Sequence, residues 1–250
     1  MGKIVTIHSS RGGVGKTLIA VNLAAAYASK GRNVFLVDLD FRAPSLFAIF
    51  RSERPGFWIN DFLNERCSLE DSMTDITHKY GTGGKFLVGF ADPSLDSIRD
   101  MTNKDRRWEM ETLRKLLSMK KLENVDYVIF DTSPGVLYSS VNAVACSDSV
   151  IVVTTTDALD LGSTDKMVRE LYRAFGKKTY VFLNKVLPEH LWEELDKNGL
   201  AKFSAELPAP VLMSAPCYCD MLNAGRADIY ALKRPEHPFS KKIYEVAEKI

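Results

Sequence analysis

The 250-residue sequence lacks several features that would assign it to a special class of protein. It has no apolar run of about 18 residues, the length that a membrane-spanning helix needs. Its N-terminal residues lead directly into a predicted strand and not into a signal peptide. Its formal net charge is only +1, so no overall field favours nucleic acid or an anionic membrane, and a contact with either would need a local patch. The sequence has no internal repeat and no low-complexity segment.

Cysteine is also scarce, with four residues in the whole chain. Without a signal peptide, these are expected to be reduced thiols of a cytoplasmic protein. A hydrophobic content of 46% over this length allows a substantial core. Nothing in the composition marks a domain boundary, so we expect residues 1–250 to form a single domain.

Apolar runs and amphipathic segments alternate along the chain. This alternation predicts an open, doubly wound, mostly parallel α/β sheet with helices on both faces. The last helix is expected to pack on the domain and not to bind a membrane. The predicted strands cover residues 3–8, 34–37, 86–90, 125–131, 149–154, 180–183 and 210–213, and the predicted helices cover 16–30, 58–63, 69–76, 105–121, a segment ending near 146, 163–175, 188–195 and 239–250.

Residues 9–17, SSRGGVGKT, lie between the first predicted strand and the first predicted helix. Strand, glycine loop and helix is the setting in which backbone N–H groups and a helix N-terminus surround a phosphate. Lys16 is expected to reach the β- and γ-phosphates, and the Thr17 hydroxyl to ligate Mg²⁺. A glycine turn before a buried helix would not explain why lysine and threonine follow the last glycine. The residues expected to bind the nucleotide here are Gly12, Gly13, Val14, Gly15, Lys16, Thr17 and Leu18.

The loop differs from the general phosphate-binding pattern, because Ser10 stands where that pattern has glycine. Residues 11–17 instead resemble the deviant loop K-G-G-x-G-K-T of the MinD/ParA group of P-loop ATPases. The resemblance extends over nearly the whole chain, with D-x-D at 38–40, D-x-x-x-G at 131–135 and asparagine at 184. It implies an ATP-dependent homodimer in which the residue at position 11 reaches the nucleotide of the opposite subunit.

Arg11 departs from the lysine of that family. Arginine is permanently charged and makes planar bidentate contacts with phosphate, so the trans contact is expected to survive the change. The alternative is that Arg11 is a solvated loop charge.

Acidic residues follow two of the predicted strands. Asp131 fits the Walker B role of holding Mg²⁺ together with Thr17, and the backbone N–H of Gly135 is expected to meet the γ-phosphate. The resemblance implies that Asp38 holds the waters of the metal and that Asp40 orients or deprotonates the attacking water. The alternative for Asp131 is that it only forms a turn, and the alternative for Gly135 is that it belongs to an ordinary Pro-Gly turn.

Asn184 and Lys185 follow the strand predicted at 180–183. By the resemblance, the Asn184 amide reads the base, and one donor and one acceptor can pair with N6 and N7 of adenine. Position 187 is leucine, so the aspartate that specifies guanine is missing and ATP is favoured over GTP. The loop after residue 213 is expected to form the other wall of the base pocket, with Pro216 in it.

Cys217 and Cys219 offer a different chemistry. Two thiolates one residue apart, doubled in a symmetric dimer, would make a four-sulfur site for Zn²⁺ or an iron–sulfur cluster. Buried free cysteine is the commoner case, and a C-x-C pair is a weak signal.

Three functions are consistent with these motifs. The first is a Mg²⁺-dependent ATPase switch that dimerises with ATP, hydrolyses it slowly and releases a protein partner, whose identity the sequence does not reveal. The second is a metal or cluster insertion ATPase that uses Cys217 and Cys219. The third is a small-molecule kinase or synthetase on the same fold, for which no substrate-binding motif is present. Contact with a membrane or DNA is not indicated.

Overall fold

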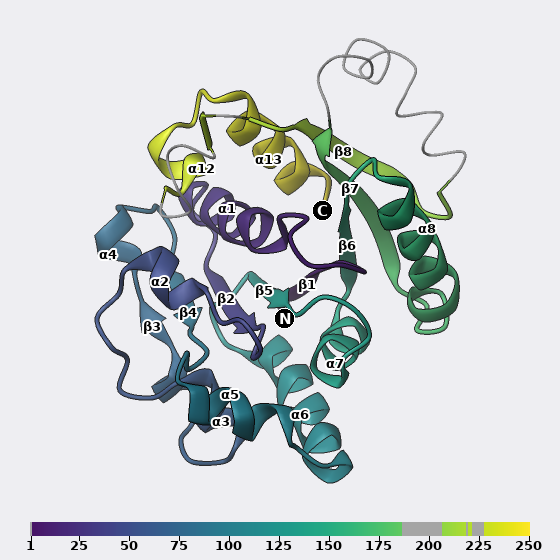
Figure 1. The fold of residues 1–250 in the computed structure, drawn as a ribbon. Coiled ribbons are helices and arrows are strands. Elements are labelled where there is room, and N and C mark those ends of the chain that lie inside the picture. Colours follow the sequence, from purple (N-terminus) through teal and green to yellow (C-terminus); the bar gives the residue numbers. More distant parts are fainter. Residues whose placement is uncertain (1, 187–206, 219, 222–227) are drawn as a thin grey trace.

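The computed structural model describes residues 2–186, 207–218, 220–221 and 228–250. The strands of this part of the chain form one sheet in the order β3-β4-β2-β5-β1-β6-β7-β8. Neighbouring strands pair parallel, except β3 with β4. This confirms the predicted open, mostly parallel architecture (Figure 1). The strands are β1 (Lys3–His8), β2 (Val34–Leu39), β3 (Thr74–Asp75), β4 (Phe86–Gly89), β5 (Tyr127–Thr132), β6 (Ser149–Thr154), β7 (Lys178–Val186) and β8 (Val211–Pro216).

One face of the sheet is covered by α1 and by the C-terminal helices (Figure 1). Because side chains of a strand alternate between its two faces, Val5 and Ile7 of β1 point to this side and share a core with Ile19 and Ile243. The last helix therefore packs on the domain, as predicted, with its apolar side buried. The helices of this face are α1 (Lys16–Ser29), α12 (Tyr230–Lys233) and α13 (Pro238–Lys249).

The opposite face is covered by three longer helical segments. Ile4 of β1 packs there with Leu116 and Ala143, and Val150 of β6 packs with Tyr172. Even-numbered positions of β1 therefore face this layer. Its helices are α6 (Arg106–Ser118), α7 (Tyr138–Cys146) and α8 (Ala158–Met167), the last of which continues into a π-helical turn, η3 (Val168–Tyr172).

The region beside β2 and β4 holds short elements, and here one prediction was wrong. Residues 69–76 do not form a helix but a 3₁₀ turn followed by β3, which pairs antiparallel with β4. The helix α5 was not predicted, although Ser94 caps it by accepting from Ser97 N. The remaining elements are α2 (Leu46–Phe50), α3 (Ile59–Leu63), η1 (Glu70–Ser72), α4 (Thr77–Tyr80), α5 (Leu95–Thr102) and η2 (Met119–Lys121).

The helix predicted at 163–175 begins earlier, at Ala158. Asp157 caps it, because its side chain accepts from Leu159 N at 2.9 Å and from Asp160 N at 3.3 Å. The helix predicted at 188–195 lies outside the described residues.

The sheet reverses its winding at β1, which lies between β5 and β6. Ligands of open α/β sheets bind at such a switch point, beyond the carboxyl ends of the strands. The loops that follow β1, β2 and β5 all begin at this edge, so the predicted phosphate loop and both predicted acidic motifs come together there.

Candidate nucleotide-binding site

The glycine loop connects β1 to α1 and depends on glycine at two positions. Gly13 and Gly15 have φ values of 80° and 103°, which side chains rarely tolerate. A Cβ on Gly15 would also lie 2.3 Å from Nδ2 of Asn184. The loop ends at the first turn of α1, where unpaired backbone N–H groups and the helix dipole favour an anion.

Lys16, the first residue of α1, is buried, and its Nζ donates to Ser9 Oγ at 3.0 Å. Burial lowers the pKa of its ammonium group, while the charges of Asp131 and Asp40 raise it in part. The lysine therefore sits between the start of the loop and two carboxylates, as a phosphate-binding lysine of this loop type would.

Asp38 and Asp131 end β2 and β5 and pair directly in the sheet register. Both carboxyl groups are fully buried, and within the described residues neither oxygen of Asp131 accepts a well-formed hydrogen bond, although the Thr17 hydroxyl and Lys16 lie close enough to interact with it. The pKa of Asp131 is raised to about 7, mainly by burial and in part by the charge of Asp40, against the lowering effects of the Thr17 hydroxyl and Lys16. A buried carboxylate without a partner is costly, and together with a hydroxyl it is a donor set of the kind that Mg²⁺ prefers. The residues present therefore fit that metal.

Asp38 makes different contacts from Asp131. Its Oδ1 accepts from Asp40 N at 3.1 Å, and its Oδ2 accepts from the N–H groups of Ser45 and Leu46, each at 3.2 Å. Burial and the charge of Asp131 raise the pKa of Asp38. Asp38 thus organises the loop after β2 and adds negative charge beside Asp131.

Asp40 is half-buried and belongs to that loop. Its Oδ1 accepts from the Ser133 hydroxyl at 2.7 Å and from Ala43 N at 3.3 Å. The contact with Ser133 joins the loop after β2 to the loop after β5. A change in the conformation of either loop therefore affects the Asp40 carboxylate, which is predicted to act on the attacking water.

Gly135 lies in the loop after β5 with a φ of 76°. Its N–H, predicted to meet the γ-phosphate, donates to Ser9 O at 2.9 Å, and its carbonyl lies 2.9 Å from His8 Nε2. The N–H is thus already paired with the backbone at the end of β1.

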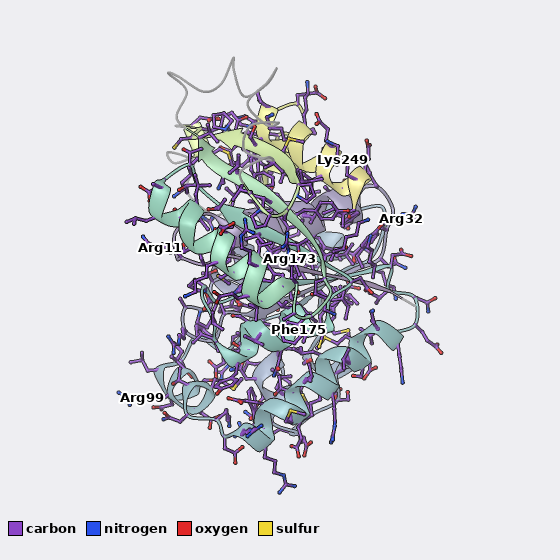
Figure 2. The ribbon with its side chains drawn as sticks, turned by 90° about the vertical axis from the view of Figure 1, so that its right-hand side faces the viewer. Arg11, Arg32, Arg99, Arg173, Phe175 and Lys249 are labelled. Carbon is purple, nitrogen blue, oxygen red and sulfur yellow. The ribbon has the colours of Figure 1, made fainter. Side chains whose placement is uncertain are left out.

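Arg11 is exposed, and its Nε lies 3.6 Å from Asp160 Oδ1 in the first turn of α8. Figure 2 shows Arg11 beside the start of this helix, at the edge of the molecule. Half of the Arg11 side chain remains in solvent, so the ion pair is weak. The guanidinium group therefore remains free to move.

A cavity of about 470 Å³ opens at the loop. It takes in eight residues that the sequence predicted: Gly12, Gly13, Gly15, Lys16, Thr17, Leu18, Asp40 and Lys185. Eleven further lining residues were missed, among them Arg42, Met221, Asp228 and Tyr230. The last three follow β8 and carry no motif, so only the fold brings them to the loop. The end of the cavity that the glycine loop lines is called the phosphate end, and their hydrophobic, acidic and aromatic side chains extend the cavity beyond it.

Comparisons with known proteins agree with this geometry. A family model described as an AAA domain matches residues 2–179. The chain belongs to the MinD/ParA-type P-loop ATPases. It is 25% identical to the septum site-determining protein MinD of Thermotoga maritima, covering 100% of this chain and 88% of that protein. It is 35% identical to the chromosome partitioning protein ParA of Myxococcus xanthus, covering 61% of this chain but only 52% of ParA.

The fold also matches solved structures of this family. MinD of Pyrococcus horikoshii in complex with Mg-ADP superposes with a TM-score of 0.78, covering 100% of this chain and 96% of that protein at 21% identity. At that identity the match shows the fold alone. Members of the MinD/ParA family are ATPases, and they bind a nucleotide together with Mg²⁺.

In this MinD/ParA-type chain, the residues predicted to read the base contact the glycine loop. Asn184 is buried, and its Nδ2 donates to Val14 O at 2.7 Å. Lys185 has a φ of 56°, unusual for a residue other than glycine, and its Nζ donates to Gly13 O at 2.7 Å. Pro216 ends β8 and, like Val14 and Asn184, is not among the residues that line the cavity. The base-reading role of Asn184 stays a prediction.

The cysteine pair receives no support as a metal site. Cys217 is a half-buried free thiol, and Cys219 lies outside the described residues. Within residues 2–186, 207–218, 220–221 and 228–250, no group of three or more metal-ligating side chains comes together. Neither relative named above is a metal or cluster insertion protein, so the cluster-insertion alternative is not supported.

No helix in the described part of the chain is long and apolar enough to cross a membrane.

Proposed function

We propose that this chain is a cytoplasmic ATPase switch in which residues 1–250 act as one domain. Binding of ATP with Mg²⁺ would bring two copies together at their nucleotide sites. Slow hydrolysis, stimulated by a protein partner, would separate them and release that partner. The observation that carries the proposal is the buried Asp131 carboxylate, which accepts no well-formed hydrogen bond within the described residues and interacts with Lys16 and Thr17, two residues that line the cavity.

The phosphate end of the cavity is proposed to act as follows. Backbone N–H groups from Gly12 to Thr17 and the Lys16 ammonium group bind the phosphates. Thr17 and Asp131 hold the metal, with Asp38 behind them. Bound Mg²⁺ would neutralise charge on the phosphates and lower the barrier to transfer.

Asp40 is proposed to orient the attacking water. It lines the cavity, and its contact with Ser133 places it between the two acidic loops. Because phosphoryl transfer depends mostly on positioning and charge stabilisation, one well-placed carboxylate has a large effect on the rate. Asn184, Lys185 and Pro216 are proposed to hold adenine, with Lys185 lining the cavity and Asn184 bonded to the glycine loop through Val14 O.

The surface around the cavity supports a contact between two copies. Val136, Tyr138 and Leu159 are 67%, 68% and 64% exposed. Val136 and Tyr138 flank Leu137, which lines the cavity, and Leu159 precedes Asp160, which pairs with Arg11. Exposed apolar side chains beside a polar site are typical of an interaction surface. Arg11 at this surface is proposed to reach the nucleotide of the opposite subunit.

Light scattering with Mg²⁺ and a slowly hydrolysed ATP analogue tests the proposal. The wild-type protein is expected to be monomeric with ADP and dimeric with the analogue. The Asp40→Ala variant is expected to bind ATP normally, to hydrolyse it at least tenfold more slowly and to remain dimeric longer. A wild-type protein that stays monomeric would overturn the dimer. Wild-type hydrolysis by Asp40→Ala would overturn the role of Asp40 alone.

A further inference from the structure

His8 is a buried histidine for which the proposed chemistry has no use. It is the last residue of β1, fully buried, and it points to the face of the sheet that α8 covers. Its Nδ1 lies 2.7 Å from the Tyr172 hydroxyl, and its Nε2 lies 2.9 Å from the carbonyl oxygen of Gly135. The ring therefore bridges the loop after β5 and the helix on the outer face.

The chemistry of the partners decides which nitrogen carries the proton. A carbonyl oxygen only accepts, so Nε2 must donate to Gly135. In a neutral imidazole the other nitrogen then accepts, so the Tyr172 hydroxyl donates to Nδ1. Burial lowers the pKa of His8 to about 4, which keeps the ring neutral at neutral pH. The network therefore has a single arrangement of protons, which the Gly135 carbonyl selects and the tyrosine hydroxyl completes.

This arrangement holds both peptide groups that flank the Gly135 Cα. The Gly135 carbonyl accepts from His8, and the Gly135 N–H donates to Ser9 O at 2.9 Å. This N–H is the one proposed to meet the γ-phosphate. A nucleoside triphosphate can recruit it only if the bond to Ser9 breaks, and a displacement of residue 135 that breaks this bond also moves its carbonyl away from His8.

The other end of the network is an irregular turn of helix. Tyr172 is fully buried at the end of η3, where Arg173 N donates to Val168 O at 3.2 Å in the i+5 spacing of a π-helix. Such turns occur frequently at functional sites. Beyond it the chain reaches the surface at Phe175, which is 41% exposed. Figure 2 shows this helix leading from Arg11 to Arg173 and Phe175.

We propose that His8 and Tyr172 are positioning residues that hold the Gly135 N–H against Ser9, and that a bound nucleoside triphosphate must displace this His8–Tyr172 latch. The inference rests on the proposed function and adds a means of regulating the same site. Because Tyr172 belongs to η3, displacement of the latch also changes the contact that holds this helical turn. The latch thus links the phosphate end of the cavity to the surface around Phe175.

The Tyr172→Phe variant tests the latch, because it keeps the ring packing and removes only the hydroxyl. Without that donor, Nδ1 of His8 loses the hydrogen bond that orients the ring, and the bond from Nε2 to Gly135 weakens. The affinity for a slowly hydrolysed ATP analogue with Mg²⁺ is expected to rise about 3- to 10-fold, the value of one hydrogen bond, while the affinity for ADP stays constant. Titration with fluorescent nucleotide analogues measures both.

Tyr80→Phe is the matched control, since the Tyr80 hydroxyl also donates to a backbone carbonyl, that of Phe50 in α2 at 3.2 Å, in a half-buried contact. It is expected to change neither affinity. If Tyr172→Phe leaves the ratio of ATP to ADP affinity unchanged, or weakens both equally, the latch is overturned. If the wild-type protein fails to bind ATP, the proposed function itself is overturned.

Nitrogen NMR of ¹⁵N-histidine in the wild-type protein gives a second readout that does not depend on how well Tyr172→Phe folds. The His8 signals are identified by their loss in His8→Gln. A neutral ring protonated at Nε2 is expected in the ADP complex, and the Nε2 signal is expected to move when the ATP analogue replaces ADP. Identical His8 signals in the two complexes would overturn the latch.

Discussion

The two sides of the glycine loop differ in how completely their polar groups are paired. On the side of β6 and α8, the residues that precede the glycines are bonded to the outer helix: His8 to Tyr172, Ser10 to Ser163 at 2.9 Å, and Arg11 to Asp160. On the side of β5 and β2, the carboxylate of Asp131 accepts no well-formed hydrogen bond within the described residues. One side of the loop is paired within the protein, and the other leaves a buried carboxylate that a bound cation would satisfy.

The energies of the two sides differ as well. Each hydrogen bond on the α8 side stabilises the fold by about 1 kcal/mol. A buried, unpaired carboxylate costs several times that amount. A bound metal with phosphates would therefore gain its binding energy on the side of β5 and β2. The contacts on the side of β6 and α8 hold the glycine loop in place. The following changes should break or sharpen this contrast.

The largest effect is expected from Lys16→Ala. This change removes the cation between the loop and the carboxylates, so the phosphates lose a buried, charge-assisted contact. Affinity for ATP is expected to fall at least a thousandfold, about 4 kcal/mol or more. Isothermal titration calorimetry measures this change. Lys30→Ala, at the exposed C-terminal end of the same helix, is the control and should bind as the wild type does.

Asp131→Asn should make the metal-free protein more stable and at the same time abolish Mg²⁺-dependent activity. The folded-state pKa of about 7 lies above the ordinary value of 3.8. Ionisation therefore destabilises the fold progressively as the pH rises from about 4 to 7. The neutral amide avoids this cost, so in the presence of a chelator above pH 7 the variant should gain up to about 4 kcal/mol. Urea unfolding measures the difference, and equal stabilities at pH 8 would contradict the prediction.

His8 should show the opposite dependence on pH. Its folded-state pKa of about 4 lies below the ordinary value of 6.5. The unfolded chain therefore binds a proton that the folded protein excludes, and stability falls as the pH drops from about 6.5 to 4, by up to about 3 kcal/mol. The His8→Gln variant lacks this pH-dependent contribution to the free energy of unfolding. The difference between the wild-type and His8→Gln unfolding curves should be flat above pH 6.5 and slope below it, and a flat difference throughout would contradict the assignment.

The smallest effect is expected from Arg11→Ala, because its ion pair with Asp160 is half-exposed. Loss of the contact across the dimer should weaken ATP-dependent dimerisation about tenfold without changing ATP binding by the monomer. Analytical ultracentrifugation with the ATP analogue measures the dimer. Arg99→Ala removes a more exposed arginine on α5, also in an ion pair, and serves as the control (Figure 2). Unchanged dimerisation by Arg11→Ala would leave Arg11 as a solvated loop charge.

Local signals predicted much of the site. The loop at 9–17 and Asp131 were found because strand, glycine, lysine and threonine follow one another directly, and because an acid ends a buried strand. Residues 69–76 were assigned wrongly as a helix, because their apolar spacing does not reveal the antiparallel partner that β4 supplies. The start of α8 was missed because the Asp157 cap lies outside the apolar pattern.

Taken alone, the sequence identified the MinD/ParA-type family and predicted the chemistry of the phosphate end, because glycine conformation, lysine charge and strand-end carboxylates act within a few residues of one another. The tertiary structure decided the rest. Only folding leaves the Asp131 carboxylate without a partner, brings Tyr230 into the cavity and places Tyr172 against His8, 164 residues away. Burial and pairing depend on what packs against a side chain, and no short stretch of sequence contains that information.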